Sequence, residues 1–244
     1  MGYFVNVNTK AYRTYQILDK LGYEQFFNVF RHLKYYKYEN IGMESVKETY
    51  FDTPNDMLLK SGILLSKIEE GNRCYIRVEN KAYDDANISD RQIFVHPIAA
   101  KDSIYDHAFY VKDGITSLFL TSFSIDLENV LKQVVPKIKI EAKANVYKIL
   151  NGAGLKIECA LEQRRYYKLA KKKADRTTHK NENLIVKLIT NDKVFAEEFE
   201  KFNNALQKYC KSLLRVDESQ SKIAERVLNK QPKPIEPNGK DVKK

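Results

Sequence analysis

The stretch ETYFDTPNDMLLKSGILLSK, residues 48–67, is the most informative part of the sequence. Its first residues have strand character, and Pro54, Asn55 and Asp56 then form a turn signal, because proline fixes φ and short polar side chains favour turns. A second run with strand character follows Gly62. The stretch therefore predicts a strand, a tight turn and the start of another strand.

A hairpin is predicted over residues 61–83, with its turn at residues 69–72. In its second arm one face carries Cys74, Ile76 and Val78, because side chains alternate along a strand. The other face carries polar and charged side chains, namely Arg73, Tyr75, Arg77, Glu79 and Lys81.

The same alternation recurs in KIKIEAKA, residues 137–144, and in LKIECALE, residues 155–162. In the first of these, isoleucines and alanines alternate with Lys137, Lys139, Glu141 and Lys143. Two interpretations fit strands of this kind. An antiparallel sheet can pack one face on a core and leave the charged face in water. Alternatively, a closed barrel can turn its charged faces into a wet lumen, where converging lysines and arginines bind an anion.

Two helical regions and several further strands complete the chain. Helical spacing of apolar residues predicts helices over residues 14–36, with a break at Gly22, and over 194–214, with Asp192 as N-cap. A further helix is predicted within residues 115–134, and strands over 91–98, 164–171 and 183–189. We expect one antiparallel β domain with a few helices over residues 1–228, and a disordered basic tail over 229–244.

The composition limits the classes of function. A net charge of +10 predicts attraction to polyanions. Three widely spaced cysteines without a CxxC pair suggest free thiols in a reducing cytosol and argue against zinc. Because no apolar run approaches the length of a membrane helix and no signal-peptide core is visible, we expect a cytoplasmic protein without a membrane partner.

Several motifs, taken in order, resemble the CYTH domain, the fold of the triphosphate tunnel metalloenzymes. They are Tyr50-Phe51-Asp52-Thr53 with the leucines and glycine that follow, the hairpin arm ending at Lys81, LKIECALE, NLIVKLITNDKVFAEEF and SQSKIAER with Ser221, Lys222 and Arg226. This family includes adenylate cyclases, thiamine triphosphatase and inorganic triphosphatase. The resemblance implies an antiparallel eight-stranded β-barrel with flanking helices and a tunnel that binds polyphosphate.

NVNTKAY, residues 6–12, departs from the family pattern. Family members begin with Glu-x-Glu-x-Lys, whose glutamates help to hold a divalent metal. Here the matching positions are Asn6, Asn8 and Lys10, and an amide brings no negative charge to a cation. Two other acidic clusters of the family are also replaced, by Ile93 and Val95 after Arg91 and by Asn183 and Ile185.

The leading hypothesis is a tunnel protein that binds triphosphate, polyphosphate or a nucleotide and has lost metal-dependent catalysis. Its expected phosphate ligands are Lys10, Lys67, Arg77, Lys81, Arg91, Lys139 and Lys143, with Lys222 as a weaker candidate. No cofactor is then expected, and whether the protein is an enzyme stays open.

Two alternatives remain. The first is an active phosphohydrolase that uses Mg²⁺ or Mn²⁺ in a rebuilt site drawn from Glu79, Glu141, Glu158 and Glu162. The second is a protein-interaction module with ion pairs filling its lumen and a partner on the helical insert near residues 13–38. Nucleic acid is an unlikely partner, because tyrosines among lysines at residues 34–38 are explained equally well by packing.

Overall fold

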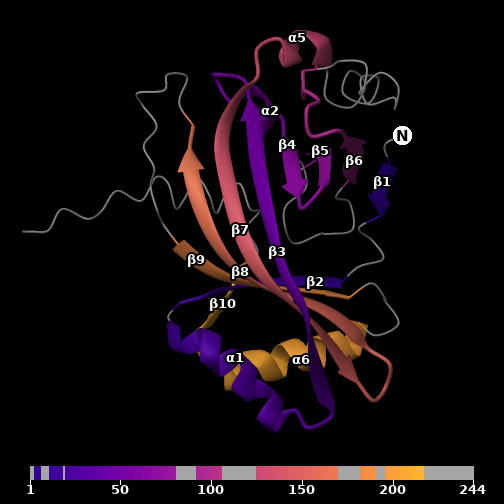
Figure 1. The fold of residues 1–244 in the computed structure, drawn as a ribbon, viewed down its shortest axis with the longest axis vertical. Coiled ribbons are helices and arrows are strands. Elements are labelled where there is room, and N and C mark those ends of the chain that lie inside the picture. The colour runs from indigo at the N-terminus through magenta and orange to yellow at the C-terminus, as the bar shows by residue number, and fades with distance from the viewer. Residues whose placement is uncertain are drawn as a thin grey trace, which may run out of the picture.

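The computed structural model describes residues 3–6, 11–18, 20–80, 92–105, 125–169, 182–190 and 196–216. Figure 1 shows a twisted sheet with α1 and α6 at one end and α5 at the other. The predicted tail over 229–244, Asp192, and residues 115–124 of the predicted helix lie outside the described residues. Among the described residues, no helix is long and apolar enough to cross a membrane.

The described elements are, in chain order, β1 (Tyr3–Asn6), β2 (Ala11–Ile17), α1 (Lys20–His32), β3 (Tyr36–Asp52), α2 (Met57–Lys60), β4 (Ile63–Glu70), β5 (Arg73–Asn80), β6 (Gln92–Ile98), α5 (Leu127–Leu131), β7 (Val135–Asn151), β8 (Lys156–Lys168), β9 (Glu182–Thr190), α6 (Ala196–Tyr209) and β10 (Leu213–Arg215). All strand pairs are antiparallel. The predicted fold class, antiparallel β with flanking helices, is confirmed at this level.

The sheet is open, and the predicted closed eight-stranded barrel is wrong for the described residues. The order is β1-β6-β5-β4-β3-β7-β8-β9-β2-β10, ten strands with β1 and β10 at the edges. The N-terminal segment nevertheless contributes a strand to each end of the sheet order, because β1 pairs with β6 and β2 pairs with β9. Asn6 and Ala11 are five Cα–Cα steps apart, which limits their separation to about 19 Å.

The first predicted helix begins later than its sequence pattern suggested. β2 runs through Tyr15 to Ile17 as a strand, and Gly22 lies inside α1 instead of breaking it. Tyr15 and Ile17 alternate with Thr14 and Gln16, and pairing with β9 and β10 decided in favour of the strand. Similarly, the strands predicted at residues 155–162 and 164–171 are one continuous strand, β8.

Two apolar cores lie on one face of the sheet, which we call the outer face. The larger core packs α1 and α6 against β2, β7, β8 and β9, with Phe26, Phe199 and Phe202 at its centre. The other core lies at the opposite end, where α5 and α2 cover β4, β5 and β6. Strand alternation then leaves the opposite residues of these strands on the inner face.

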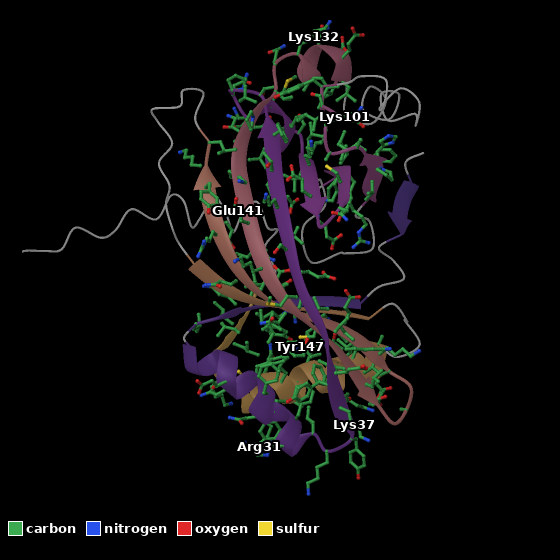
Figure 2. The ribbon with its side chains drawn as sticks, in the orientation of Figure 1. Arg31, Lys37, Lys101, Lys132, Glu141 and Tyr147 are labelled. Atoms are coloured by element: carbon green, nitrogen blue, oxygen red, sulfur yellow. The ribbon has the colours of Figure 1, made fainter. Side chains whose placement is uncertain are left out.

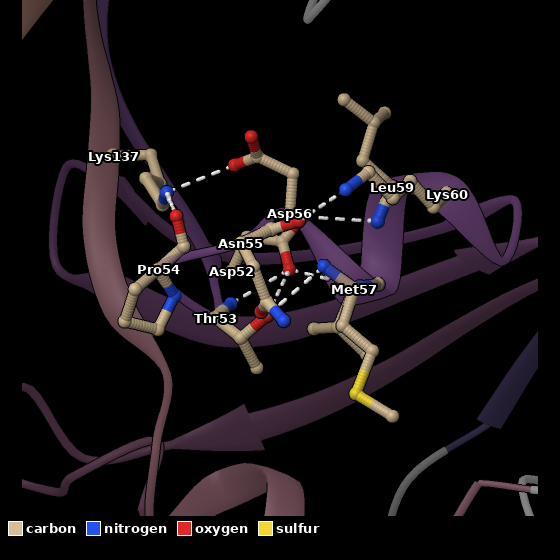
Figure 3. Close-up of polar contacts among 10 residues, drawn as sticks. Asp52, Thr53, Pro54, Asn55, Asp56, Met57, Leu59, Lys60 and Lys137 are labelled. Atoms are coloured by element: carbon tan, nitrogen blue, oxygen red, sulfur yellow. Dashed lines mark hydrogen bonds and ion pairs between the residues drawn. The ribbon is translucent and has the colours of Figure 1, made fainter.

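Asp52 and Thr53, from the motif Tyr50-Phe51-Asp52-Thr53, stabilise the turn after β3. The carboxylate of Asp52 accepts backbone hydrogen bonds from Thr53 (2.7 Å), Leu58 (2.8 Å) and Leu59 (2.9 Å), as Figure 3 shows in part. The Thr53 hydroxyl accepts another from the backbone N–H of Met57 at 2.9 Å. The motif therefore caps α2 and satisfies amides that burial would otherwise leave unpaired.

Candidate functional site

A cavity of about 220 Å³ opens on the inner face of the sheet. Its lining comes from β3, β4, β5, β7 and β8: Glu44, Val46, Glu48, Ile68, Glu70, Tyr75, Arg77, Ile140, Ala142, Ala144, Glu158, Ala160, Glu162 and Arg164. Residues far apart in sequence meet here because these strands are neighbours in the sheet.

Three alanines make room for the cavity. Ala142 and Ala144 lie on β7, and Ala160 lies on β8. In the antiparallel register Ala142 is opposite Arg164, and Ala144 is opposite Glu162. The long charged side chains of β8 therefore stand beside positions that carry only a methyl group.

Arg164 is the most unusual residue of the cavity. Its side chain is 1% exposed, and its Nε donates to Oε2 of Glu162 at 2.6 Å. Neither Nη1 nor Nη2 has a hydrogen-bond partner among the described residues. Burial by itself lowers the pKa of Arg164, but interactions with the Glu162 carboxylate and with Tyr166 outweigh it and the pKa is raised, so the guanidinium stays charged.

Arg77 supplies a second buried cation, but it is more fully paired. It forms an ion pair with Glu48, donates to the Tyr50 hydroxyl at 3.2 Å, and its Nε lies 3.8 Å from Oε2 of Glu79. Burial lowers the pKa of Arg77, whereas Glu48, Tyr50 and Glu79 raise it, and the net direction is upward. Both arginines therefore stay positively charged and form ion pairs with glutamates.

Further polar atoms on the inner face lack a partner in the described part of the chain. The hydroxyl of Ser66 on β4 is buried and has none, and the same holds for Thr14 on β2. Ser66 is opposite Arg77 in the β4–β5 register, and Thr14 is opposite Lys187 in the β2–β9 register. Because buried polar groups are normally satisfied, these donors point to a bound anion or water.

The cavity is more acidic than the sequence suggested. The expected site residues contained more bases than acids, whereas five glutamates and two arginines line the cavity. Glu48 and Glu162 pair with the arginines, while Glu44 and Glu158 are exposed. The carboxylates that form no ion pair with the described residues are thus the better solvated ones, so water screens their charge more than that of Arg164.

Arg77 is the one predicted phosphate ligand that the structure places in this cavity; Lys67, Lys139 and Lys143 do not line it. The Lys67 ammonium donates to the carbonyls of Ala100 and Asp102, both at 3.1 Å. Lys10, Lys81, Arg91 and Lys222 lie outside the described residues.

Strand alternation explains the placement of Lys139 and Lys143. Both alternate with the cavity-lining residues of β7, so they belong to the opposite face. Lys139 lies 2.5 Å from Glu141, which also accepts from the Tyr167 hydroxyl at 2.9 Å. The charged half of KIKIEAKA is therefore external, and its alanines are internal.

The positions where family acids are replaced lie mostly beside the cavity. Ile93 and Val95 are opposite Glu79 and Arg77 in the β5–β6 register. On β9, Asn183 is opposite Arg164 and Ile185 is opposite Glu162. Ile185 is fully buried, and an isoleucine offers no atom to a metal.

At the N-terminus, β1 pairs with β6. Asn6 is opposite Gln92, and it is Val5 that is opposite Ile93, the residue level with Glu79. Asn8 lies outside the described residues.

The described residues do not fit a divalent metal in the way the resemblance implied. Val95 and Ile185 are apolar, and no group of three or more acids, histidines or cysteines in the described ranges is arranged to hold an ion. No chemical step is therefore assigned to a metal.

Arg164 was missed by sequence reasoning, although a signal for it existed. The alternation of Glu158, Ala160 and Glu162 continues directly to Arg164 if β8 is not interrupted. Dividing residues 155–171 into two strands removed it from the set of inward-facing residues.

No family model matches the chain, and no curated protein matches it. Among solved structures, it is similar to HpAC1 from Hippeastrum, a proposed adenylyl cyclase with a dominant triphosphatase activity, at a TM-score of 0.57 and 9% identity over 88% of this chain and 94% of that one. It is also similar to a proposed adenylate cyclase from Bacillus halodurans, at a TM-score of 0.50 and 12% identity over 88% and 98% of the two chains.

These comparisons define the fold. The chain has the CYTH-type fold of adenylate cyclase-like and triphosphatase tunnel proteins, as the sequence motifs indicated. At identities of 9% and 12% the likeness shows the fold alone, so ligand and activity rest on this chain's own residues.

Proposed function

We propose that the inner cavity binds a phosphate-rich anion, such as triphosphate, polyphosphate or the phosphates of a nucleotide, through Arg164 with help from Arg77. The observation that carries this proposal is the buried guanidinium of Arg164, with both terminal nitrogens unpartnered within the described chain and next to a cavity. Buried N–H groups of a guanidinium that have no hydrogen-bond partner are costly unless a ligand or water accepts from them.

The chemistry of the guanidinium favours phosphate. Its planar fork offers parallel N–H groups that match two oxygens of one phosphate group, and such charge-assisted hydrogen bonds are short and strong. The Tyr166 hydroxyl, also buried, influences the pKa of Arg164 but makes no hydrogen bond of normal geometry to it. It supplies one more donor near the same place.

Glu162 sets the strength of this site. Its carboxylate occupies only Nε of Arg164, yet its charge opposes any anion that approaches the other two nitrogens. Removing that charge while keeping the shape should therefore tighten anion binding. This effect is opposite in sign to the loss expected from a purely structural role.

We also propose that the usual metal-dependent catalysis is absent, because Ile93, Val95 and Ile185 occupy positions beside the cavity where the resemblance implied glutamates. The phosphohydrolase alternative is favoured by a different observation, the presence of Glu48, Glu158 and Glu162 in the lining. Glu141, considered for that rebuilt site, is not among the cavity-lining residues.

Titration calorimetry with tripolyphosphate, once in EDTA and once with Mg²⁺, tests the proposal. Glu162→Gln should bind at least about tenfold more tightly than the natural chain, because one opposing charge is gone. The double variant Glu162→Gln with Arg164→Gln should bind at least about tenfold more weakly, and it leaves no uncompensated buried charge. Lys143→Gln is the matched control, since it removes a positive charge from outside the cavity and should leave the affinity unchanged.

Each other result has a defined meaning. Equal affinities for the double variant and the natural chain would overturn the role of Arg164. Binding that requires Mg²⁺, with phosphate release lost in Glu158→Gln, would replace the proposal with the phosphohydrolase. Absence of binding in both buffers would leave the interaction module, in which the Arg77–Glu48 and Arg164–Glu162 ion pairs of the inner face would have a structural role.

A further inference from the structure

The first half of β3 forms an edge that the rest of the sheet does not cover. β7 pairs with β3 from Tyr36 to Asp52, whereas β4 pairs with it only from Val46 to Phe51. Within the described chain, residues 36–45 therefore have a strand on one side only. Their free backbone groups can pair with a further strand.

This edge is exposed and partly apolar. Residues 37–45 are all exposed, and Met43 is 84% exposed, Ile41 56% and Tyr38 46%. The helical insert, by contrast, uses its own apolar residues internally, with Phe26 and Val29 buried against the sheet. The exposed apolar surface of this region therefore lies on the strand edge and not on the helix.

A one-residue bulge at Ile41 exchanges the two faces of the strand. Asn40 is opposite Tyr147 and Gly42 is opposite Val146, so Ile41 has no partner on β7. Gly42 has φ of +136°, and its N–H donates to the Asn40 side chain at 2.9 Å. Before the bulge odd-numbered residues face inward, and after it even-numbered residues do.

Contacts of the flanking residues confirm this exchange. Tyr38 packs on Phe27 and Phe30 of α1, on the outer face, whereas Glu44 lines the inner cavity. Two strands can pair directly only at residues that share a face. When an unbulged strand pairs antiparallel with the same strand of a second copy, the residue numbers of each opposed pair add up to an even number. Because the bulge shifts the alternation by one residue, the residue numbers of pairs opposed across it add up to an odd number.

We propose that two copies of this chain pair antiparallel through residues 36–45 of β3, about a two-fold axis at the bulge. In the register where the residue numbers of each opposed pair add up to 81, Lys37 of each copy lies opposite Glu44 of the other on the inner face. Tyr38 lies opposite Met43 on the outer face. Both pairs occur twice, and both are favourable, as opposite charges and as a sulfur–aromatic contact.

The register is bounded by the structure itself. Beyond Ser45 the edge is taken by β4, since Val46 is opposite Glu70. Pairing of Tyr36 with Ser45 therefore ends the ladder just before it would meet the β4–β5 hairpin. Lys37 lies on the free part of β3, at the end away from α5 (Figure 2).

Bulges and charges also serve to protect edge strands from pairing. The two roles differ in one respect. Protection needs only that charges be present, whereas self-pairing needs Lys37 and Glu44 to be of opposite sign. A charge reversal therefore distinguishes them.

Sedimentation velocity of the full chain over a range of concentrations, without ligand, tests this inference. We expect a reversible dimer. Lys37→Glu should raise the dissociation constant by about tenfold or more, because two attractive pairs become repulsive. Lys34→Glu is the matched control, with the same change of charge three residues away and outside the ladder.

Combining Lys37→Glu with Glu44→Lys should restore the dimer, since the charges are exchanged. A chain that stays monomeric at all concentrations would overturn the proposal, and so would equal effects of the Lys37 and Lys34 variants. These readouts need no phosphate ligand, so they stand apart from the test of the cavity.

Discussion

The two faces of the sheet differ, because the inner face buries charged side chains beside an apolar cluster that includes Tyr50, Ile140 and Tyr166. On the outer face, large apolar side chains such as Phe202 and Ile157 are buried under helices. On the inner face, Arg164, Glu162 and Glu79 are just as inaccessible, although they are charged. Burial alone therefore does not identify a core. What marks the inner face as a site is the cost of burying charge without completing its hydrogen bonds.

The largest expected effect concerns the outer core. Phe202→Ala should lower the free energy of unfolding by about 3–5 kcal/mol, because a buried ring that packs on Phe30 and Tyr36 leaves a cavity. Urea denaturation measures this loss. Leu18→Ala, at a residue 59% exposed, should change stability by less than about 0.5 kcal/mol. Similar losses for both variants would contradict the assignment of the core.

A smaller loss is expected at the turn after β3. Asp52→Asn should cost about 1–3 kcal/mol, because an amide nitrogen replaces either Oδ1, which accepts from Thr53 and Leu58, or Oδ2, which accepts from Leu59, and a nitrogen cannot accept these bonds. Asp56→Asn is the control: its side chain is half exposed and makes one ion pair, with Lys137. Thermal unfolding of the two variants compares them, and an equal loss would refute the capping role of Asp52.

Filling the inner cavity should separate binding from stability. Ala160→Leu introduces bulk into the cavity without changing any charge, and we expect tripolyphosphate affinity to fall at least about tenfold. Overpacking typically costs about 1–3 kcal/mol, so the melting temperature should drop only moderately. Calorimetry after confirming a folded circular dichroism spectrum checks the result. Unchanged affinity would mean that the ligand does not use this cavity.

The smallest effect is expected at Glu141. Hydrogen bonding to Lys139 lowers the pKa of this carboxyl, helped by Tyr167, while burial opposes the shift. A pKa lowered by folding stabilises the protein above the usual carboxyl range, and this stabilisation is lost as the pH falls through the lowered pKa.

Glu141→Gln should therefore cost a few tenths of a kcal/mol at neutral pH and nothing once the pH has fallen below the lowered pKa. Urea denaturation at several pH values measures the difference. The variant should bind tripolyphosphate normally, because Glu141 lies outside the cavity. A pH-independent loss would assign its role to packing instead of charge.

Much of the sheet follows from the sequence. The hairpin of β4 and β5, with Gly71 in its turn at φ of +56°, is a local feature that two strand patterns and a turn signal specify. Helix α6 likewise follows from its apolar stripe, with Phe199, Phe202 and Leu206 buried. Tyr15 was misassigned because aromatic spacing in a short window fits both helix and strand, and only pairing with β9 decides.

The site was less predictable, and β7 shows why. Alternation fixes that Lys139 and Lys143 share one face and Ala142 and Ala144 the other. It does not say which face is enclosed. The charged face was expected inside because cations suit a polyanion, whereas the alanines leave the room that a cavity needs.

The sequence by itself determined the strand alternation, the turn at residues 54–56, the CYTH-type fold and the apolar replacements at Val95 and Ile185. Only the tertiary structure decided that Arg164 is buried with unpartnered nitrogens, and that ten residues of β3 form an open edge. The physical reason is that periodicity is a local property of the chain. Enclosure and the completion of hydrogen bonds depend on which distant strands become neighbours.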